Sequence, residues 1–190
     1  MQKIYIVTGA NGFLGNNIVR QLIKKEPEAE IRALVSSLDR ANALKDLKCQ
    51  IFAGDITKPE SLAKIFEVSK SAKAYVIHCA ALVYIKSQPN PQVYQVNVNG
   101  TRNIVAKTLE IDGKLVCVNS VHAIPELPNH AEMSEVNHFN PAKVEGEYAK
   151  SKAEAAQYVL DAVKNRGLDA CIVHPSGIIG PYDFKTTHLT

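Results

Sequence analysis

The chain has 190 residues, of which 46% are hydrophobic, and its 22 basic and 19 acidic side chains give a formal net charge of +3. This length suits one domain with a well-buried core, and the scattered basic residues argue against a nucleic-acid-binding surface. No apolar run is long enough to cross a bilayer, and the N-terminus enters a strand at once. We therefore expect a cytoplasmic protein without a membrane partner.

The first 25 residues predict a strand, a tight turn and a helix. An apolar run at 4–7 is followed by Gly9, Gly12 and Gly15, and then by apolar residues at helical spacing. Glycines at this spacing allow a sharp turn and let phosphate oxygens approach bare amides. The helix N-terminus adds unpaired N–H groups and the positive end of its dipole. This turn is a candidate site for the pyrophosphate of a dinucleotide.

Five further strands are predicted from apolar runs at 30–35, 49–53, 74–79, 115–118 and 170–173. Three helical patterns separate the later ones: one with Thr57 as its N-cap that runs through Phe66, a long one over 91–111, and another over 143–166 that Gly167 stops. The segment 39–47 is weakly patterned. The polar segment 122–141 is a surface excursion, too long for a simple connector.

Continuous apolar strands separated by helices predict an α/β fold with a parallel sheet covered on both faces. Right-handed crossovers make the sheet doubly wound, as in the Rossmann fold, with a ligand crevice at the carboxyl ends of the strands. Gly9, Asp55, His78, Ser120 and Pro175 all fall at or just after a strand end. One cofactor could therefore contact all five.

The four cysteines are Cys49, Cys79, Cys117 and Cys171, and they form no Cys-x-x-Cys pair. Each lies in or beside a predicted core strand. We expect buried free thiols that act as small hydrophobes, with no disulfide and no metal site.

Tyr148 and Lys152 are four residues apart on the last predicted helix, so their side chains share a face. Ser120 ends the fifth predicted strand. A phenol donates a proton near neutral pH more readily when a nearby ammonium stabilises its anion, and a serine hydroxyl can orient the substrate oxygen. Hydride addition to a carbonyl needs such a donor, because the developing alkoxide must be protonated.

These features together resemble the extended short-chain dehydrogenase/reductases, the NAD-dependent epimerase/dehydratase family. The resemblance covers essentially the whole chain. Its motifs are Thr8-Gly9-x-x-Gly12-x-x-Gly15, Gly54-Asp55-Ile56, His78-x-Ala80-Ala81, Asn97-Val98-x-Gly100-Thr101, Ser120, Tyr148-x-x-x-Lys152, and Pro175-Ser176-Gly177-Ile178-Ile179-Gly180-Pro181.

The resemblance implies a role for each motif. Tyr148 would be the catalytic acid/base, Lys152 would lower its pKa and hold the nicotinamide ribose, and Ser120 would bind the substrate oxygen. Asn97 would support the fold or a proton relay, or be a plain helix-surface amide. The implied cofactor-binding residues are Gly9, Asn11, Gly12, Phe13, Leu14 and Gly15 at the turn, Asp55 and Ile56 beside the adenine, Ala80 and Ala81 in the cleft wall, and Pro175 and Ser176 beside the nicotinamide.

The choice of cofactor depends on the end of the second predicted strand. An acidic residue there would bind the adenosine ribose and reject a 2′-phosphate. This chain has Ser36 and Ser37 in that place, and Asp39 comes later. Arg40, or less favourably Arg32, could receive a phosphate. We expect NADP, with NAD as the alternative.

The segment 174–181 and the lack of an early acidic residue look most like the dihydroflavonol reductase-like branch of the family. That resemblance implies an NADP-dependent oxidoreductase that reduces a ketone or aldehyde, a small-molecule carbonyl substrate. One alternative is a nucleotide-sugar epimerase or dehydratase with the same triad. Another is a dinucleotide-binding regulator without catalysis, which the complete triad disfavours.

The resemblance also implies a longer protein, with a substrate-binding lobe after the turn at Gly180 and Pro181, and we expect this lobe to be absent here. The expected division is a dinucleotide-binding Rossmann domain at 1–176 and the start of a truncated substrate-binding region at 177–190. Members of the family commonly dimerise through two long helices. A stripe of small apolar residues on the last helix favours such a homodimer: Ala149, Ala153, Ala156, Leu160 and Val163.

Overall fold

A computed structural model of the chain describes residues 1–86 and 88–183. Its six strands are β1 (Lys3–Thr8), β2 (Glu30–Val35), β3 (Gln50–Ala53), β4 (Lys73–His78), β5 (Lys114–Val118) and β6 (Asp169–Val173). They form one parallel sheet in the order β3-β2-β1-β4-β5-β6. The order reverses between β1 and β4, which places a crevice at the carboxyl ends of these two strands. The predicted doubly wound α/β fold is confirmed.

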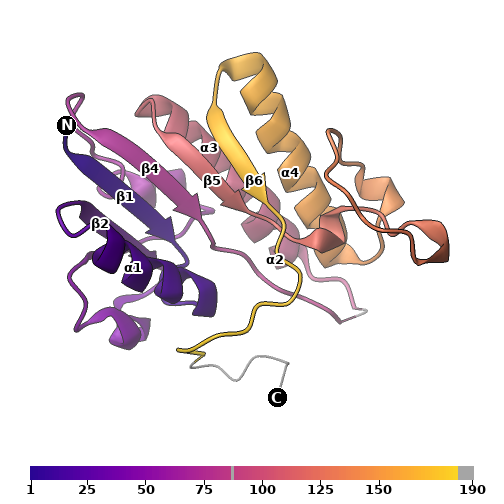
Figure 1. Ribbon diagram of the computed structural model, residues 1–190, viewed down its shortest axis with the longest axis horizontal. Coiled ribbons are helices and arrows are strands. Elements are labelled where there is room, and N and C mark those ends of the chain that lie inside the picture. Colours follow the sequence, from indigo (N-terminus) through magenta and orange to yellow (C-terminus); the bar gives the residue numbers. More distant parts are fainter. Residues whose placement is uncertain (87, 184–190) are drawn as a thin grey trace.

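Helices lie on both sides of this sheet (Figure 1). They are α1 (Phe13–Lys25), α2 (Pro91–Tyr94), α3 (Gly100–Glu110) and α4 (Glu147–Arg166). On one face, α3 and α4 cover alternate residues of the central strands, such as Ile6 and Val76, in a fully buried cluster that also contains Ile104 and Val159. On the other face, α1 and the turns at 38–44 cover Val7 and the neighbouring residues of β2.

The coverage of the second face is incomplete at the β6 end of the sheet. Cys171 is exposed, and Val173 is 42% exposed. Both point to the face that α1 covers only over β1 and β2, because residues two apart on a strand share a face. The prediction of four buried thiols was therefore wrong for Cys171. Cys117 is buried, and Cys49 and Cys79 are half-buried.

The long helix predicted over 91–111 is interrupted. α2 leads into a π-helical turn at Gln95–Asn99, and α3 follows directly. A π-turn places one extra residue in the helix and re-aims the side chains around it, and such turns are common at functional sites. Here the turn contains Asn97, which is 2% exposed.

Two other predicted helices differ from those in the structure, one in its length and type and the other in its first residue. The helix expected from Thr57 to Phe66 is only a short 3₁₀ helix, Pro59–Leu62, with Lys58 as its N-cap residue. Thr57 instead bonds with its backbone N–H and its hydroxyl to the Asp55 carboxylate, at 2.9 and 2.8 Å, in a local turn. The last helix starts at Glu147 rather than 143, because Gly146 has φ +82° and breaks the helical path.

The small-residue stripe of α4 is largely internal. Ala149, Ala153 and Ala156 are buried in a cluster with Phe139 of the excursion that follows β5 and with Val144, just before α4. The excursion thus covers the face of α4 that the sequence analysis assigned to a partner chain.

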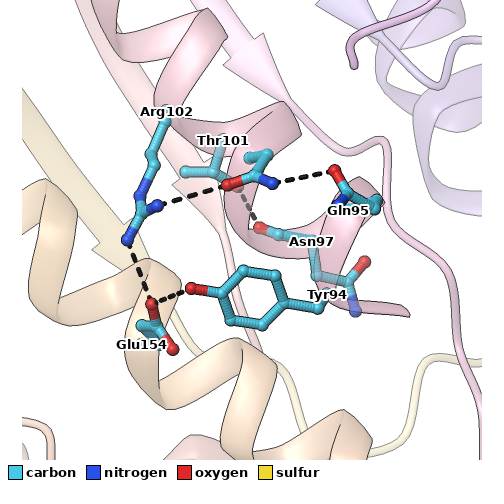
Figure 2. A network of polar contacts seen from close by, with 7 residues as sticks. Tyr94, Gln95, Asn97, Thr101, Arg102 and Glu154 are labelled. Atoms are coloured by element: carbon cyan, nitrogen blue, oxygen red, sulfur yellow. Dashed lines mark hydrogen bonds and ion pairs between the residues drawn. The ribbon is translucent and has the colours of Figure 1, made fainter. Parts of the chain in front are cut away.

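A polar network on the surface joins the helices at the π-turn (Figure 2). Glu154 of α4 accepts hydrogen bonds from the Tyr94 hydroxyl and from Arg102, the latter at 3.0 Å. Arg102 also donates to Asn99, at 3.2 Å. These contacts fix α2 and α3 against α4.

The chain after β6 turns back along α1. The Asn17 amide donates to the Pro181 carbonyl at 2.8 Å, and the Arg20 guanidinium stacks over the Tyr182 ring at 4.0 Å. Pro181 and Tyr182 therefore lie against the first helix, and residues 184–190 of the predicted substrate-binding region lie outside the described residues.

Candidate active site

In the turn between β1 and α1, backbone groups approach one another so closely that a side chain would not fit at two of the three glycines. Gly9 has φ +64°, and a Cβ atom there would lie 2.9 Å from the Ala80 backbone. A Cβ on Gly15 would collide with the Gly9 carbonyl. The Gly12 N–H closes the turn onto the Gly9 carbonyl at 2.9 Å. Larger side chains at Gly9 and Gly15 would push the strand, the turn and the helix apart.

α1 begins at Phe13 without a side-chain cap and without an acidic residue in its first turn. The first N–H groups of a helix have no partner within the helix, and they lie at the positive end of its dipole. The bare backbone at Gly12 leaves them accessible. This cradle fits a pyrophosphate, as expected from the sequence.

A buried chain of polar contacts connects this turn with the helices on the far side of β4. Thr8 Oγ1 lies 2.7 Å from His78 Nδ1, and it accepts the N–H groups of Cys79 and Ala80, each at 3.1 Å. His78 Nε2 lies 3.1 Å from Thr101 Oγ1. Burial, with a smaller contribution from the Lys152 charge, lowers the pKa of His78 to about 3. His78 is therefore a neutral structural link that positions the loop after β4.

Asn97 extends this network to the last helix. Its side-chain oxygen accepts the Leu82 N–H at 2.7 Å, and its amide donates to the Leu82 carbonyl and to Ser151 Oγ, each at 3.0 Å. Ser151 Oγ donates in turn to the Tyr148 carbonyl at 2.7 Å. Both amide protons of Asn97 are used, so this residue holds the loop after β4 and the start of α4 together.

Two cavities lie along the carboxyl ends of the strands. The first has a volume of about 280 Å³ and lies between the glycine turn and the ends of β2 and β3. Its lining residues include eight of the predicted ones: Gly9, Asn11, Gly12, Ser36, Asp55, Ile56, Ala80 and Ala81. Ala81 and Cys79 line this cavity and the second one, so the two spaces meet behind the loop after β4.

The second cavity, about 730 Å³, contains the predicted chemistry. Its lining residues include Phe13, Leu14, Ser120, Tyr148, Lys152, Pro175 and Ser176. Apolar side chains that the sequence analysis did not select form another part of the wall: Val83, Ile85 and Ile178. Val83 and Ile85 are 60% and 75% exposed in a loop. Exposed aliphatic residues directly after a strand end were a signal that could have found this wall.

Within this cavity Tyr148 lies with Ser120 and Lys152. Burial raises the pKa of the Tyr148 phenol, and the Ser120 hydroxyl opposes this rise. The Lys152 ammonium donates to the Val118 carbonyl at 3.0 Å, and burial lowers its pKa. Lys152 was expected to lower the pKa of Tyr148. In this structure Ser120, and not Lys152, opposes the rise that burial causes. A Cys79 thiol with its pKa raised to about 12 by burial stays neutral beside them.

Gly15 and Arg32 are predicted site residues that line neither cavity. Gly15 lies under the turn, where it permits the close approach described above. Arg32 is bound elsewhere, because its guanidinium donates to Glu30 at 2.6 Å and to the Ile65 and Glu67 carbonyls. The side chain of Arg40 lies outside the described residues.

His122 is a site residue that the sequence analysis missed. It follows Ser120 by two positions, and its Nδ1 lies 3.0 Å from Ser120 Oγ. Its ring packs edge-on against the Tyr148 ring, with 6.1 Å between centroids. A histidine so close in sequence to a candidate catalytic serine was the available signal.

This geometry agrees with what the chain is similar to. The family model of the 3-beta hydroxysteroid dehydrogenase/isomerase family matches residues 6–190. The chain belongs to this family. Its relatives are dehydrogenases, reductases and dehydratases of the extended short-chain type, which confirms the resemblance drawn from the motifs.

Individual relatives extend the comparison. A Synechocystis protein that carries the name of a dihydroflavonol 4-reductase is 32% identical over 98% of this chain and 52% of its own length. The 3 beta-hydroxysteroid dehydrogenase type 7 of Mus musculus is 33% identical over 93% of this chain and 50% of its own length. The chain spans about half the length of the curated relatives it matches.

A solved structure shows the same fold. It is the dTDP-glucose 4,6-dehydratase of Bacillus anthracis in complex with NAD, which superposes with a TM-score of 0.78 at 22% identity. The match covers 96% of this chain and 57% of that one. No helix within residues 1–86 and 88–183 is both long and apolar enough to span a membrane.

Proposed function

We propose that this chain is the cofactor-binding and catalytic part of an NADP-dependent oxidoreductase that reduces a ketone or aldehyde, with Tyr148 as the proton donor. The observation that carries the proposal is that Ser120, Tyr148 and Lys152 line one cavity together with Phe13 and Leu14, which directly follow the glycine turn at Gly12. The bound dinucleotide would supply the hydride. The residues of the chain would bind it, orient the carbonyl and deliver the proton.

Each residue has a definite task in this proposal. The amides at the start of α1 would bind the pyrophosphate of the dinucleotide, and Asp55 and Ile56 would contact its adenine. Ser120 donates to the carbonyl oxygen, and the Tyr148 O–H bond breaks as its proton moves to the developing alkoxide. A phenol of ordinary pKa, about 10, already holds its proton at neutral pH, and burial raises the pKa of Tyr148 further, so the proton is present when reduction begins.

The preference for NADP is part of the proposal. Ser36, not an acidic residue, directly follows β2 and lines the first cavity. A short neutral side chain leaves room for a 2′-phosphate, which a carboxylate at this position would repel. NAD is the alternative, and it is the cofactor in the B. anthracis structure.

A nucleotide-sugar epimerase or dehydratase remains the second candidate, since the same triad serves both reactions and the fold is shared with such an enzyme. The wall formed by Val83, Ile85 and Ile178 favours an apolar carbonyl compound over a diphosphate sugar. Turnover of an aryl or alicyclic ketone, measured beside turnover of a dTDP-sugar, decides between the two.

The proposal is tested by Tyr148→Phe, which removes the acidic proton and keeps the ring. We expect the affinity for NADPH to stay within about twofold and ketone reduction to fall by at least about 10²-fold. Tyr158→Phe is the matched control: Tyr158 is on the same helix, bonds to Arg166 at 3.1 Å, and does not line the second cavity. Reduction that persists in Tyr148→Phe would show that the proton comes from another group.

A further inference from the structure

His122 has contacts that none of the roles above explains. It lies in a 3₁₀ turn, Val121–Ala123, that Ser120 caps. The ring Nδ1 is 3.0 Å from Ser120 Oγ, and the His122 backbone N–H donates to the same oxygen at 3.3 Å. The ring also packs edge-on against Tyr148. Serine, tyrosine and histidine therefore form one contiguous group.

The hydroxyl of Ser120 joins the other two residues. A serine hydroxyl has one proton to donate and two lone pairs to accept with. The His122 N–H uses one lone pair, and a proton on the imidazole Nδ1 uses the other. The hydroxyl proton of Ser120 is then available to the Tyr148 oxygen in the same cavity. A proton can therefore pass from the imidazole to Ser120 Oγ while the proton of Ser120 passes to the tyrosine oxygen.

The imidazole also has access to solvent. His122 is exposed, and it lines both the 730 Å³ cavity and a neighbouring one of about 360 Å³. Charged groups of both signs face it from the surrounding elements. These are Glu126 of the excursion, Lys143 and Glu145 before α4, Glu147 and Lys152 of α4, Lys86 of the loop after β4, and the Tyr148 phenol. One side of the ring thus reaches Ser120 and the other reaches water.

The sequence analysis also considered a proton relay through Asn97. The groups that such a relay would use are already hydrogen-bonded elsewhere. Both amide protons of Asn97 are bound, to the Leu82 carbonyl and to Ser151. The Lys152 ammonium donates to the Val118 carbonyl. Among the contacts described above, the path that leads from Tyr148 to solvent runs through Ser120 and His122.

We propose that His122 is a positioning residue that returns a proton to Tyr148 through the hydroxyl of Ser120. After Tyr148 has protonated the product alkoxide, the Ser120 hydroxyl turns from the substrate oxygen to the phenolate oxygen and gives up its proton to it. The Nδ1 proton of His122 moves to Ser120 Oγ, and water protonates Nε2. Each group ends with the number of protons it had before the reaction began, and no electrons are exchanged. This inference rests on the proposed function.

The first experiment reads the coupling without any turnover. The Tyr148 phenol is titrated by NMR of ¹³Cζ-labelled tyrosine, assigned with Tyr148→Phe, in four forms: the wild type, His122→Ala, Ser120→Ala and the double variant. We expect His122→Ala to move the midpoint of Tyr148 by about half a unit to one unit, as the loss of one hydrogen bond implies. In the Ser120→Ala background the same change should have little effect, because the link is missing.

The second experiment measures reduction of the same ketone with NADPH. We expect His122→Ala to lower kcat by about 10-fold or more while KM stays within about twofold, and added imidazole to restore part of the rate. His138→Ala, an exposed histidine of the same excursion, is the control that should leave both constants and the imidazole response unchanged.

Two results overturn the relay. One is a Tyr148 midpoint that responds equally to His122→Ala with and without Ser120, which would show direct ring contact alone. The other is a kcat that is unchanged in His122→Ala. If no form turns over any carbonyl compound while the NMR coupling is present, the proposed function fails and the coupling stands, so the two failures are distinguishable.

Discussion

At the scale of single residues, the turn between β1 and α1 depends on the absence of a Cβ atom at Gly9 and at Gly15. Gly15 lies directly against the Gly9 carbonyl, and Gly9 against the Ala80 backbone. These are contacts between main-chain groups, which cannot move aside as the end of a flexible side chain can. The close approach of helix and strand is therefore the property that Gly15 supplies.

We expect Gly15→Ala to lower the free energy of unfolding by about 1–3 kcal/mol through overpacking and to weaken dinucleotide binding. Urea unfolding measures the first effect. Gly177→Ala is the control for stability, because a Cβ there meets nothing within 4 Å. Equal stability of the two variants would contradict the account of the turn.

Most cofactor-binding residues could be predicted one by one, because a strand end and a glycine spacing determine their place in a parallel sheet. The hydrogen-bond and ring partners of the buried polar side chains could not be predicted in this way. Asn97 binds Leu82 and Ser151, which lie 15 and 54 positions away. His122 meets Tyr148 only because α4 packs beside the end of β5. Such pairings depend on how elements pack, which a single sequence does not encode locally.

At the scale of elements, β1 and β4 are joined by a buried polar chain as well as by their ladder. Thr8, His78 and Thr101 connect the two strands with α3. A histidine whose pKa falls from 6.5 to about 3 on folding must stay neutral in the native state. The unfolded chain then binds more protons than the native one between these two pH values, so acid destabilises the fold.

The sign and size of this effect follow from linkage. The contribution of His78 is complete above pH 6.5 and is lost as the pH falls toward about 3. By pH 5 the loss is on the order of 2 kcal/mol. We expect the free energy of unfolding to fall by about 2 kcal/mol more between pH 7.5 and pH 5 in the wild type than in His78→Gln. Parallel pH profiles of the two proteins would contradict the buried neutral histidine.

The strands were predicted within one or two residues because long apolar runs are an unambiguous signal in a buried parallel sheet. The helices were less predictable. The π-turn at 95–99 depends on tertiary contacts of Asn97 that periodicity does not reveal. At Thr57 the residue type suited an N-cap, but its side chain bonds to Asp55 and the following helix is a single 3₁₀ turn.

At the scale of the whole molecule, the apolar surfaces divide into those that the chain covers itself and those that it leaves exposed. The excursion after β5 covers Ala149, Ala153 and Ala156 of α4. Cys171 and Val173 of β6 remain exposed on the opposite face of the sheet. A homodimer through the two long helices stays a prediction, and it would have to use surfaces other than the buried part of the stripe.

Ala153 distinguishes an internal stripe from a subunit interface. It is fully buried within the chain, so we expect Ala153→Leu to lower the free energy of unfolding by about 1–3 kcal/mol at every protein concentration. Val163→Ala, at the exposed end of the stripe, should change it by no more than about 0.5 kcal/mol. A destabilisation that disappears at high protein concentration, together with a dimeric mass in sedimentation, would place Ala153 in an interface instead.

The account as a whole depends on the two cavities being one dinucleotide cleft. The direct measurement is a calorimetric titration of the 190-residue chain with NADPH and with NADH at one ionic strength. We predict one site per chain for NADPH and weaker binding of NADH, with both weakened in Gly15→Ala. A chain that is folded and binds neither dinucleotide would contradict the central claim.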